Sequence, residues 1–477
     1  MKTLLARLRS RWLMRAVIAI FAIFILLIVW KIGEREWTRS VSNQELAAAI
    51  EETDRSDPDW RWEALNAKRP RPPEGRNGAD LIRLIKNQMS EDWGKPLFIQ
   101  GWEPVRDIPA NTRFPAEVIV EARRVCEIRP AIELARSLKD RPLGLRVLQL
   151  TPMVTNTPLP DTQSTRSVSD LLHWDAVLAI EDGNRIQATD SVHAMLNASR
   201  SIGDETCLTS QLARMATRMR ATRALEWVLA QTELTVERLS ALQAAWATDA
   251  EDPLLLYALR GERATLDVLM ENLQSGVTHP GTWPEVGEVH RGLLGELRWW
   301  HYRGWLPGDR ARLLHNFNTV VEAARKPVEE QVQNKSTFNV PPHDRNHRIA
   351  GLLFPPTKAV AESYWRSVAD MRCAIAALAC ERYRLKHGSW PASLAALVTD
   401  YLHAVLRDPF DGQPVRMKHV ADGIIIYSLG VDQTDDGGDL RRPDNPNGKD
   451  EGFRLWNAKE RRKPAAQRPA ELKDEAP

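Results

Sequence analysis

The residues of this sequence that could do chemistry gather first in an acidic loop near the C-terminus. Residues 430–440 read GVDQTDDGGDL, and four aspartates lie close together there: Asp432, Asp435, Asp436 and Asp439. Calcium takes roughly six to eight oxygen ligands, which these carboxylates and nearby backbone carbonyls could supply. The spacing differs from that of an EF-hand loop, and the alternative is an acidic turn in contact with water. We expect a calcium ion with a structural role.

A second candidate is the pair of histidines in the sequence HDRNH, His343 and His347. Two imidazoles at this spacing resemble the His-Glu-x-x-His helix of zinc peptidases, in which a carboxylate between two zinc ligands acts as general base. Here the carboxylate, Asp344, is one methylene shorter, two prolines precede the pair, and no third ligand is apparent. Two interpretations follow: the solvated start of a helix, and a metal-dependent hydrolase that uses His343 and His347.

Other catalytic patterns are absent from the sequence. It contains no glycine-rich phosphate loop, no Gly-x-Ser-x-Gly elbow and no Cys-x-x-Cys pair. The four cysteines permit one or two disulfides, although Cys373 and Cys380 lie about 10 Å apart along one expected helix and cannot bridge each other. Without a complete catalytic set, the sequence favours an interaction protein over an enzyme.

An apolar segment near the N-terminus predicts a membrane anchor. Residues 16–30 contain no polar side chain, and with their apolar neighbours they approach the ~20 residues that a spanning helix needs. No Ala-x-Ala pattern follows, which favours a signal anchor over a cleaved signal peptide. Mixed charges follow the segment and only basic residues precede it: Lys2, Arg7, Arg9, Arg11 and Arg15. The positive-inside rule therefore places the N-terminus in the cytoplasm and nearly all of the chain outside it.

Charge and composition limit the kinds of partner. Five of the 65 basic residues precede Ala16, which leaves 60 against 63 acidic residues. A nearly neutral body lacks the basic surface that nucleic acid requires, so we expect no nucleic-acid partner. Hydrophobic residues make up 43% of the chain, which is enough to build ordinary cores.

Apolar residues at helical spacing predict a mainly α-helical body. We expect Ser42 and Thr235 to cap helices, Pro130 to interrupt one, and a loop over 151–165. The expected helices are 43–53, 78–89, 116–139, 171–180, 186–198, 208–229 and 235–246. Short turns between the later helices indicate antiparallel hairpins stacked in an array.

Two further clusters lie in or beside this array. Aromatic residues cluster beside arginines over 298–305 (RWWHYRGW), where they could stack on a sugar or a peptide or fill contacts between helices. Glu262 and Arg263 could form a buried ionic contact with Asp175 of another hairpin. The role of each cluster depends on which helices pack against it.

The C-terminal region has a different pattern. A helix is expected over 357–386, ended by Gly388, then a short helix over 391–398 and a hairpin of strands 415–419 and 423–428. The segment CERYRLKHGSWP, followed by Asp408-Pro409, Tyr427-Ser-Leu-Gly and Asp432, resembles the soluble domain of the major pseudopilin of type II secretion systems. That resemblance covers roughly residues 374–440 and implies a long helix, a small antiparallel sheet and calcium in the acidic loop.

The chain departs from that family in two ways. A pseudopilin continues its spanning segment directly into this helix and carries a prepilin cleavage site, whereas here more than 300 residues intervene and no such site precedes Ala16. The module therefore looks borrowed by a different protein. Over most of its length the chain also resembles uncharacterised anchored proteins of bacteria rich in pseudopilin-like domains, which implies a location and no activity.

These features combine into one expected architecture: a mainly α protein with a transmembrane helix, a helical-hairpin array and a small α+β pseudopilin-like module. The expected parts are a basic cytoplasmic segment (1–15), the anchor (16–32), a stalk and Pro/Arg linker (33–75), the hairpin domain (76–340), the module (356–456) and a disordered tail (457–477). The expected function is a membrane-anchored, non-catalytic scaffold linked to secretion or envelope assembly, and the alternative is the metal-dependent hydrolase.

Overall fold

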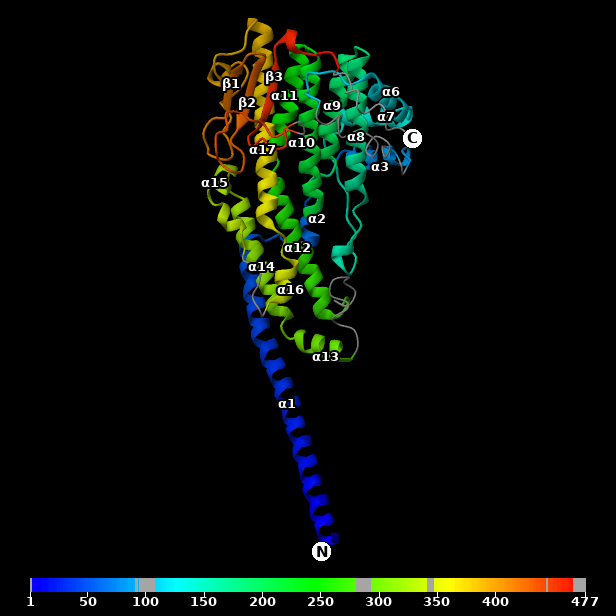
Figure 1. The fold of residues 1–477 in the computed structure, drawn as a ribbon, viewed down its shortest axis with the longest axis vertical. Coiled ribbons are helices and arrows are strands. Elements are labelled where there is room, and N and C mark those ends of the chain that lie inside the picture. The colour runs from blue at the N-terminus through cyan, green and yellow to red at the C-terminus, as the bar shows by residue number, and fades with distance from the viewer. Residues whose placement is uncertain are drawn as a thin grey trace.

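One long helix, α1 (Lys2–Ser56), joins the N-terminus to the body of the protein. The computed structural model describes residues 2–90, 93, 108–279, 293–340, 347–442 and 445–465. Figure 1 shows the first half of α1 projecting from the body as an isolated rod. Its apolar segment is entirely exposed, and by length and composition this helix can cross a membrane.

The second half of α1 packs along α14 (Leu306–Ala324). Thr38, Ser42, Leu46 and Ala49 are buried there. The expected separate helix over 43–53, capped by Ser42, is therefore wrong: Ser42 lies inside α1. Since no proline interrupts residues 32–43, the apolar helix simply continues into the body.

Helices α8, α9 and α10 pack on one another, whereas α11 packs chiefly on α17 and only slightly on α9, so the expected stacking of consecutive hairpins does not extend from α10 to α11. Left-handed Gly183 and Gly203 lie in the turns between α8, α9 and α10, with φ of 74° and 63°. Thr235 caps α11, as predicted. The bounds are α8 Pro160–Glu181, α9 Arg185–Arg200, α10 Leu208–Gln231 and α11 Val236–Ala250. Helix α8 begins inside the expected loop, because a proline at the first turn loses no hydrogen bond.

Further helices extend this array on both sides. Against α8 and α9 lie α3 (Gly78–Asn87), α7 (Arg129–Arg136) and the 3₁₀ helix η1 (Ser137–Asp140), and α6 (Ala116–Val125) also contacts α8. Toward α1 lie α2 (Trp62–Ala67), α12 (Leu254–Ser275), α13 (Leu293–Tyr302), α15 (Val328–Gln333), η4 (Lys335–Phe338) and α16 (Arg348–Leu353). The short η2 (Val154–Asn156) packs on α12.

Helix α17 (Thr357–His387) is the longest helix of the body and ends at Gly388 in the left-handed conformation, as predicted. Met371, Ile375 and Leu378 lie in one hydrophobic core with α8–α11, whereas Tyr364 and Val368 lie in a second core with α12 and α14. The regions expected as separate domains, 76–340 and 356–456, thus share their cores. The physical reason is that α17 has apolar or small residues on most of its circumference, so it is buried on several sides.

A three-stranded antiparallel sheet covers one side of α17 (Figure 1). The strands are β1 (Arg416–Val420), β2 (Gly423–Ser428) and β3 (Glu451–Trp456), in the order β1-β2-β3. Arg416 pairs with Tyr427, and Ile424 pairs with Leu455. The hairpin is confirmed, and the short helix expected over 391–398 is reduced to η5 (Leu394–Leu397).

The segment after β3 is not disordered over the residues that the structure describes. It forms η6 (Ala458–Glu460), and the buried Arg461 donates to both carboxylate oxygens of Glu381 at 2.8 and 2.9 Å. The backbone of Lys463 exchanges hydrogen bonds with Asn111 and Arg113. The charged composition suggested a solvated tail, but its arginine is held by a buried carboxylate. Residues 466–477 of the expected tail lie outside the described residues.

Candidate functional site

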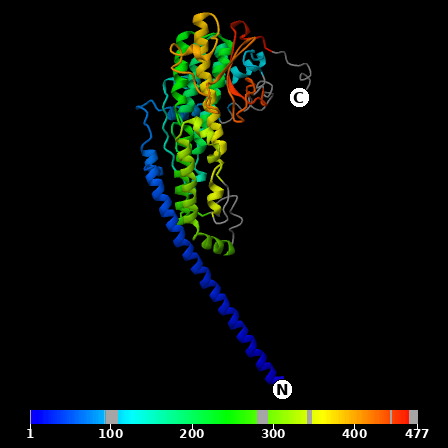
Figure 2. The same ribbon diagram turned by 90° about the vertical axis from the view of Figure 1, so that its left-hand side faces the viewer.

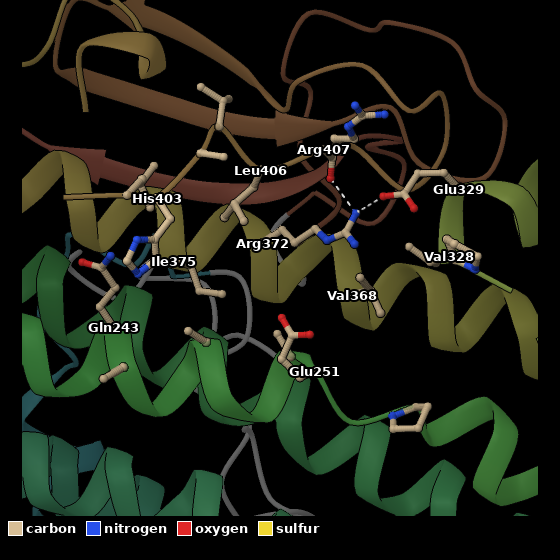
Figure 3. Close-up of a pocket in the computed structure, with 18 of the residues that line it drawn as sticks. Gln243, Glu251, Val328, Glu329, Val368, Arg372, Ile375, His403, Leu406 and Arg407 are labelled. Atoms are coloured by element: carbon tan, nitrogen blue, oxygen red, sulfur yellow. Dashed lines mark hydrogen bonds and ion pairs between the residues drawn. The ribbon is translucent and has the colours of Figure 1, made fainter. Parts of the chain in front are cut away.

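An open groove of about 800 Å³ lies between α11 and α17, and we call it the α11–α17 groove. Residues 399–407 form one wall, and residues 324–331, from the end of α14 into α15, form the far end. Figure 3 shows Gln243 and His403 at one end and Glu329 and Arg407 at the other. Ligand pockets usually enclose about 300–1,000 Å³, so this groove is large enough for a ligand or a peptide segment.

Small and apolar side chains line the middle of the groove. Ala244 and Ala247 of α11 leave room beside α17, which contributes Val368 and Ile375, and Leu406 covers them from the wall. Because alanine carries only one side-chain carbon, two helices in contact leave a furrow where alanines repeat on one face. The furrow is therefore a property of the α11 sequence.

The wall formed by residues 399–407 is fastened to both helices. Gln243 donates from Nε2 to the carbonyl of Tyr401 at 2.7 Å, and Arg372 donates to the carbonyl of Arg407 at 2.7 Å. Thr399 at the start of the wall has a φ of 87°, which is rare for a β-branched residue. Backbone strain of this kind is concentrated at functional sites in proteins, so the turn at Thr399 supports the groove as a candidate site.

The groove carries more unpaired cations than unpaired carboxylates. Arg372 is neutralised by Glu329, with Nη1 and Oε1 at 2.6 Å. Arg382 donates to the Gln243 amide oxygen at 2.8 Å and lies over the Tyr401 ring, and its buried Nε has no hydrogen-bond partner. Within the described part of the chain, no carboxylate pairs with Arg382, Arg407 or Lys326, and among the acids of the groove only Glu251 is unpaired. The groove is thus suited to an anionic group.

The four aspartates of the acidic loop lie together, but each already has partners in the protein. The Lys449 ammonium lies 3.8 Å from both Asp432 and Asp436. Asp435 accepts from the Tyr427 hydroxyl at 3.1 Å and pairs with Arg416, and Asp439 accepts from the Asn445 amide at 2.6 Å. Among the described residues no group of three or more histidine, cysteine or acidic side chains has the arrangement of a metal site.

A further acid, Asp450, lies beneath this loop and was not singled out from the sequence. It is fully buried, its Oδ2 accepts from the Gly438 amide at 2.8 Å, and its Oδ1 has no hydrogen-bond partner. Burial, together with the negative charges of Asp436 and Asp435, raises the pKa of Asp450 to about 6. An acceptor left without a partner beside other carboxylates is the one feature here that fits a bound cation.

The histidine pair can be followed only in part. His343 lies outside the described residues. His347 immediately precedes α16, and a positive charge on it would lower the pKa of Asp309 in α14. Asp309 accepts from the Tyr302 hydroxyl at 2.6 Å and from the Ala350 amide at 2.9 Å. Burial raises the pKa of Asp309 to about 6. The carboxylate thus holds the start of α16 against α14.

The expected contact of Glu262 and Arg263 with Asp175 does not form. Arg263 instead binds Asp57 just after α1, and Asp175 accepts from Arg136 of α7 at 2.5 and 2.8 Å. Glu262 is left with a weak hydrogen bond from the Leu208 amide at 3.4 Å. The prediction was wrong because the stacking of the hairpins places residue 175 on a different side of the array.

The tryptophan-rich cluster separates into an inner and an outer face. Trp299 is 6% exposed and stacks on Tyr302, with ring centroids 6.2 Å apart, so this part fills contacts between helices. Trp300 is 40% exposed and lies under the guanidinium of Arg35, which is 4.4 Å from the ring centroid.

The cysteines are all free, and burial raises the pKa of Cys126 to about 12, so that thiol is not an activated nucleophile.

The groove residues were not predicted from the sequence. The local signal was that Arg372 and Arg382 lie on either side of a run of apolar and small residues, 373–380, in one long helix. Their meaning depends on α11 and on the wall at 399–407, which come from distant parts of the chain. No protein-family model, curated protein or solved structure matches this chain.

Proposed function

We propose that this protein is a membrane-anchored interaction protein whose α11–α17 groove binds an acidic segment of another protein outside the cytoplasm. The observation that carries the proposal is the groove itself, which combines an apolar furrow with guanidinium groups that no carboxylate of the described chain neutralises. An apolar furrow with cations at its rim favours a partner that alternates apolar and acidic side chains.

The shape of the groove favours a peptide over a compact ligand. Val368 and Arg382 both line it and lie 14 residues apart on α17, so this stretch of the groove is about 21 Å long at 1.5 Å per residue, and Tyr364 extends the lining beyond Val368. An extended peptide advances about 3.3 Å per residue, so about six residues would occupy this length. The partner segment is therefore a short extended stretch.

The location follows from the charges that flank the anchor. Only basic residues precede the apolar segment, which favours a cytoplasmic N-terminus and a body on the opposite side of the membrane. A membrane-impermeant protease added to intact cells tests this orientation. It is expected to remove a tag fused after Pro477 and to spare a tag fused before Met1, and the opposite pattern would contradict the proposal.

A link to secretion or envelope assembly rests on the resemblance of the C-terminal region to the major pseudopilin. The long helix α17 and the small antiparallel sheet packed on it agree with that resemblance at the level of secondary structure. Since this region shares its cores with the helical array of the same chain, we place its role in contacts with other proteins.

Peptide binding tests the groove. The probe is a fluorescein-labelled hexapeptide of alternating leucine and aspartate, measured by anisotropy against the full chain in detergent micelles. We expect binding that weakens with salt, and at least about tenfold weaker binding, or 1.4 kcal/mol, when Arg382→Ala and Arg407→Ala are combined. The control Arg71→Ala removes an exposed arginine outside the groove and should change nothing. Equal binding of a leucine–lysine hexapeptide would overturn the proposal.

Calcium at the acidic loop is a structural part of the proposal. The predicted aspartates, together with the orphaned Oδ1 of Asp450, would hold the ion, which would neutralise the loop and fasten it to β3. Elemental analysis and thermal melting with and without chelator test this. One calcium per chain, with a melting shift that Asp450→Asn removes, is the expected result, and no shift on chelation in the calcium-loaded protein would contradict it.

A second candidate function, the metal-dependent hydrolase, is favoured by one observation. His347 lies near the carboxylate of Asp309, so an imidazole and an acid are close together in a part of the protein that also includes the Tyr302 hydroxyl. Zinc that copurifies in stoichiometric amount and is lost in His347→Ala would support this candidate. A folded protein without transition metal would remove it.

A further inference from the structure

Among the described elements, helix α13 contacts α1 next to its exposed half. Figures 1 and 2, which differ by a quarter turn, both show it at the lower edge of the body, lying across the direction of α1. The contact is direct: Arg35 of α1 donates from Nε to the carbonyl of Trp300 at 3.0 Å. The chain that follows α13 also lies against α1, since a Cβ on Gly304 would be 3.2 Å from the carbonyl oxygen of Arg35.

The position of Arg35 on α1 fixes the height of α13 relative to a membrane. The apolar run of α1 ends at Ile32, and Arg35 is three residues further, or about 4.5 Å along the helix axis. The headgroup layer of a bilayer is about 5–7 Å thick on each side of the hydrocarbon. If the apolar run spans the bilayer, the Trp300 backbone lies within the headgroup layer.

The outward face of α13 has the composition of a membrane interface. Gly295, Trp299 and Tyr302 point toward the protein, whereas Leu297 and Trp300 are 54% and 40% exposed and lie three residues apart on the other face. Arg298, next to Leu297 in the sequence, is also exposed, and so is the acidic Glu296. Tryptophan is enriched at the boundary between hydrocarbon and water, and an arginine beside it can bind lipid phosphate.

We propose that α13 is an interfacial helix that inserts Leu297 and Trp300 into the headgroup layer beside the anchor. The proposal rests on the membrane-anchored function above. It adds to the spanning helix a second contact with the membrane, made by a helix that lies parallel to the membrane surface. Two contacts at different places stop the body from tilting and rotating about α1, and so hold the α11–α17 groove at a constant height above the membrane.

Spin-label depth measurements on the full chain in phosphatidylcholine/phosphatidylglycerol liposomes test this. Nitroxides are attached at Leu297→Cys on α13, at Leu26→Cys in the anchor and at the exposed Leu84→Cys on α3, which lies in the upper half of the body in Figure 1, away from α13. The unsubstituted chain, treated in the same way, gives the background from its four cysteines. The measured quantity is the ratio of oxygen to nickel-chelate collisions, which rises with depth.

We expect the ratio at position 297 to lie between the high value at position 26 and the low value at position 84. A ratio at 297 equal to that at 84, with position 26 in the hydrocarbon, would overturn the interfacial helix and leave the anchor intact. A low ratio at position 26 would instead overturn the anchor and with it the proposed function. Arg298→Cys provides a second label site if Leu297→Cys does not fold.

Discussion

Single buried acids show how strongly each position depends on the partners that the fold supplies. Asp57 contacts α12 and Glu262 lies on α12, yet the fold lowers the pKa of Asp57 and raises the pKa of Glu262. Burial opposes the ionisation of Asp57, but Arg260 and Arg263 outweigh it and lower its pKa. Burial alone raises the pKa of Glu262 to about 7, because only one backbone amide opposes it.

Glu262→Gln is expected to stabilise the protein at alkaline pH. The pKa of Glu262 is higher in the folded than in the unfolded chain, so the folded state loses stability as pH rises through about 7. The variant should gain up to about 3 kcal/mol at pH 8 and little at pH 5, because the carboxyl is then protonated in the folded chain. Denaturant unfolding at both pH values measures this, with the exposed Glu271→Gln as control. An equal gain at both pH values would point to a cause other than ionisation.

Asp57→Ala is expected to destabilise the junction between α1 and the body. Asp57 is 4% exposed, and it accepts from Arg260 at 2.6 and 2.8 Å, from Arg263, and lies 3.3 Å from Arg325. Its removal leaves buried guanidinium groups unpaired and should cost about 3–5 kcal/mol in unfolding free energy. Asp59→Ala, which removes an exposed ion pair with Lys68, should change it by less than about 1 kcal/mol. Similar effects of the two substitutions would contradict this account.

At the scale of elements, segments far apart in sequence hold one another in place. The segment after β3 joins three parts of the body, because Arg461 contacts Glu381 of α17 and the carbonyl of Thr232 after α10, while Lys463 bonds to Asn111. The same kind of cross-chain contact holds the wall of the α11–α17 groove, where Gln243 fixes Tyr401. Segments that look peripheral in the sequence, such as the one after β3, therefore hold distant parts of the body together.

Arg461→Ala is expected to lower the unfolding free energy by about 2–3 kcal/mol. Glu381 is fully buried, and without Arg461 it keeps only Arg384 as a cationic partner among the described residues. Thermal melting of the variant measures the loss, and the exposed Lys459→Ala should stay within about 0.5 kcal/mol of the parent chain. No loss in Arg461→Ala would mean that the segment does not stabilise the body.

At the scale of the whole molecule, the described parts of the helical array and of the C-terminal region share a hydrophobic core. Core residues of α17 and the sheet pack against those of α8–α11, so either part alone would expose apolar surface. Helix α1 connects this body to its own apolar half through contacts with α14. The groove and α13 consequently have defined positions relative to the apolar half of α1.

Shared cores predict that both parts unfold together. Leu378 of α17 is fully buried, and Leu378→Ala should lower the unfolding free energy by about 2–5 kcal/mol. Hydrogen exchange measures the effect: amides of α9 and of β2 should lose protection by the same factor. Loss of protection in β2 with α9 unchanged would show two independent domains, and the exposed Leu84→Ala serves as control.

Local signals in the sequence determined which segments became helices and where many of them end. The apolar run before Ile32, the cap at Thr235 and the glycine at 388 act through residues within one or two turns, so their effects can be read without the fold. The same holds for the β1–β2 hairpin, whose strands are separated only by a turn. Binding of calcium to the acidic loop stays a prediction.

Only the tertiary structure decided which residues meet. Arg263 binds Asp57, 206 residues away, in place of the expected Asp175, and the groove needs α11, α17 and the wall at 399–407 together. Residues 457–465, the described part of the charged tail, are held because the buried Glu381 accepts from Arg461, and α13 lies beside α1 because α14 packs on α1. Ion-pair partners and grooves depend on the positions of whole helices, and no short stretch of sequence contains that information.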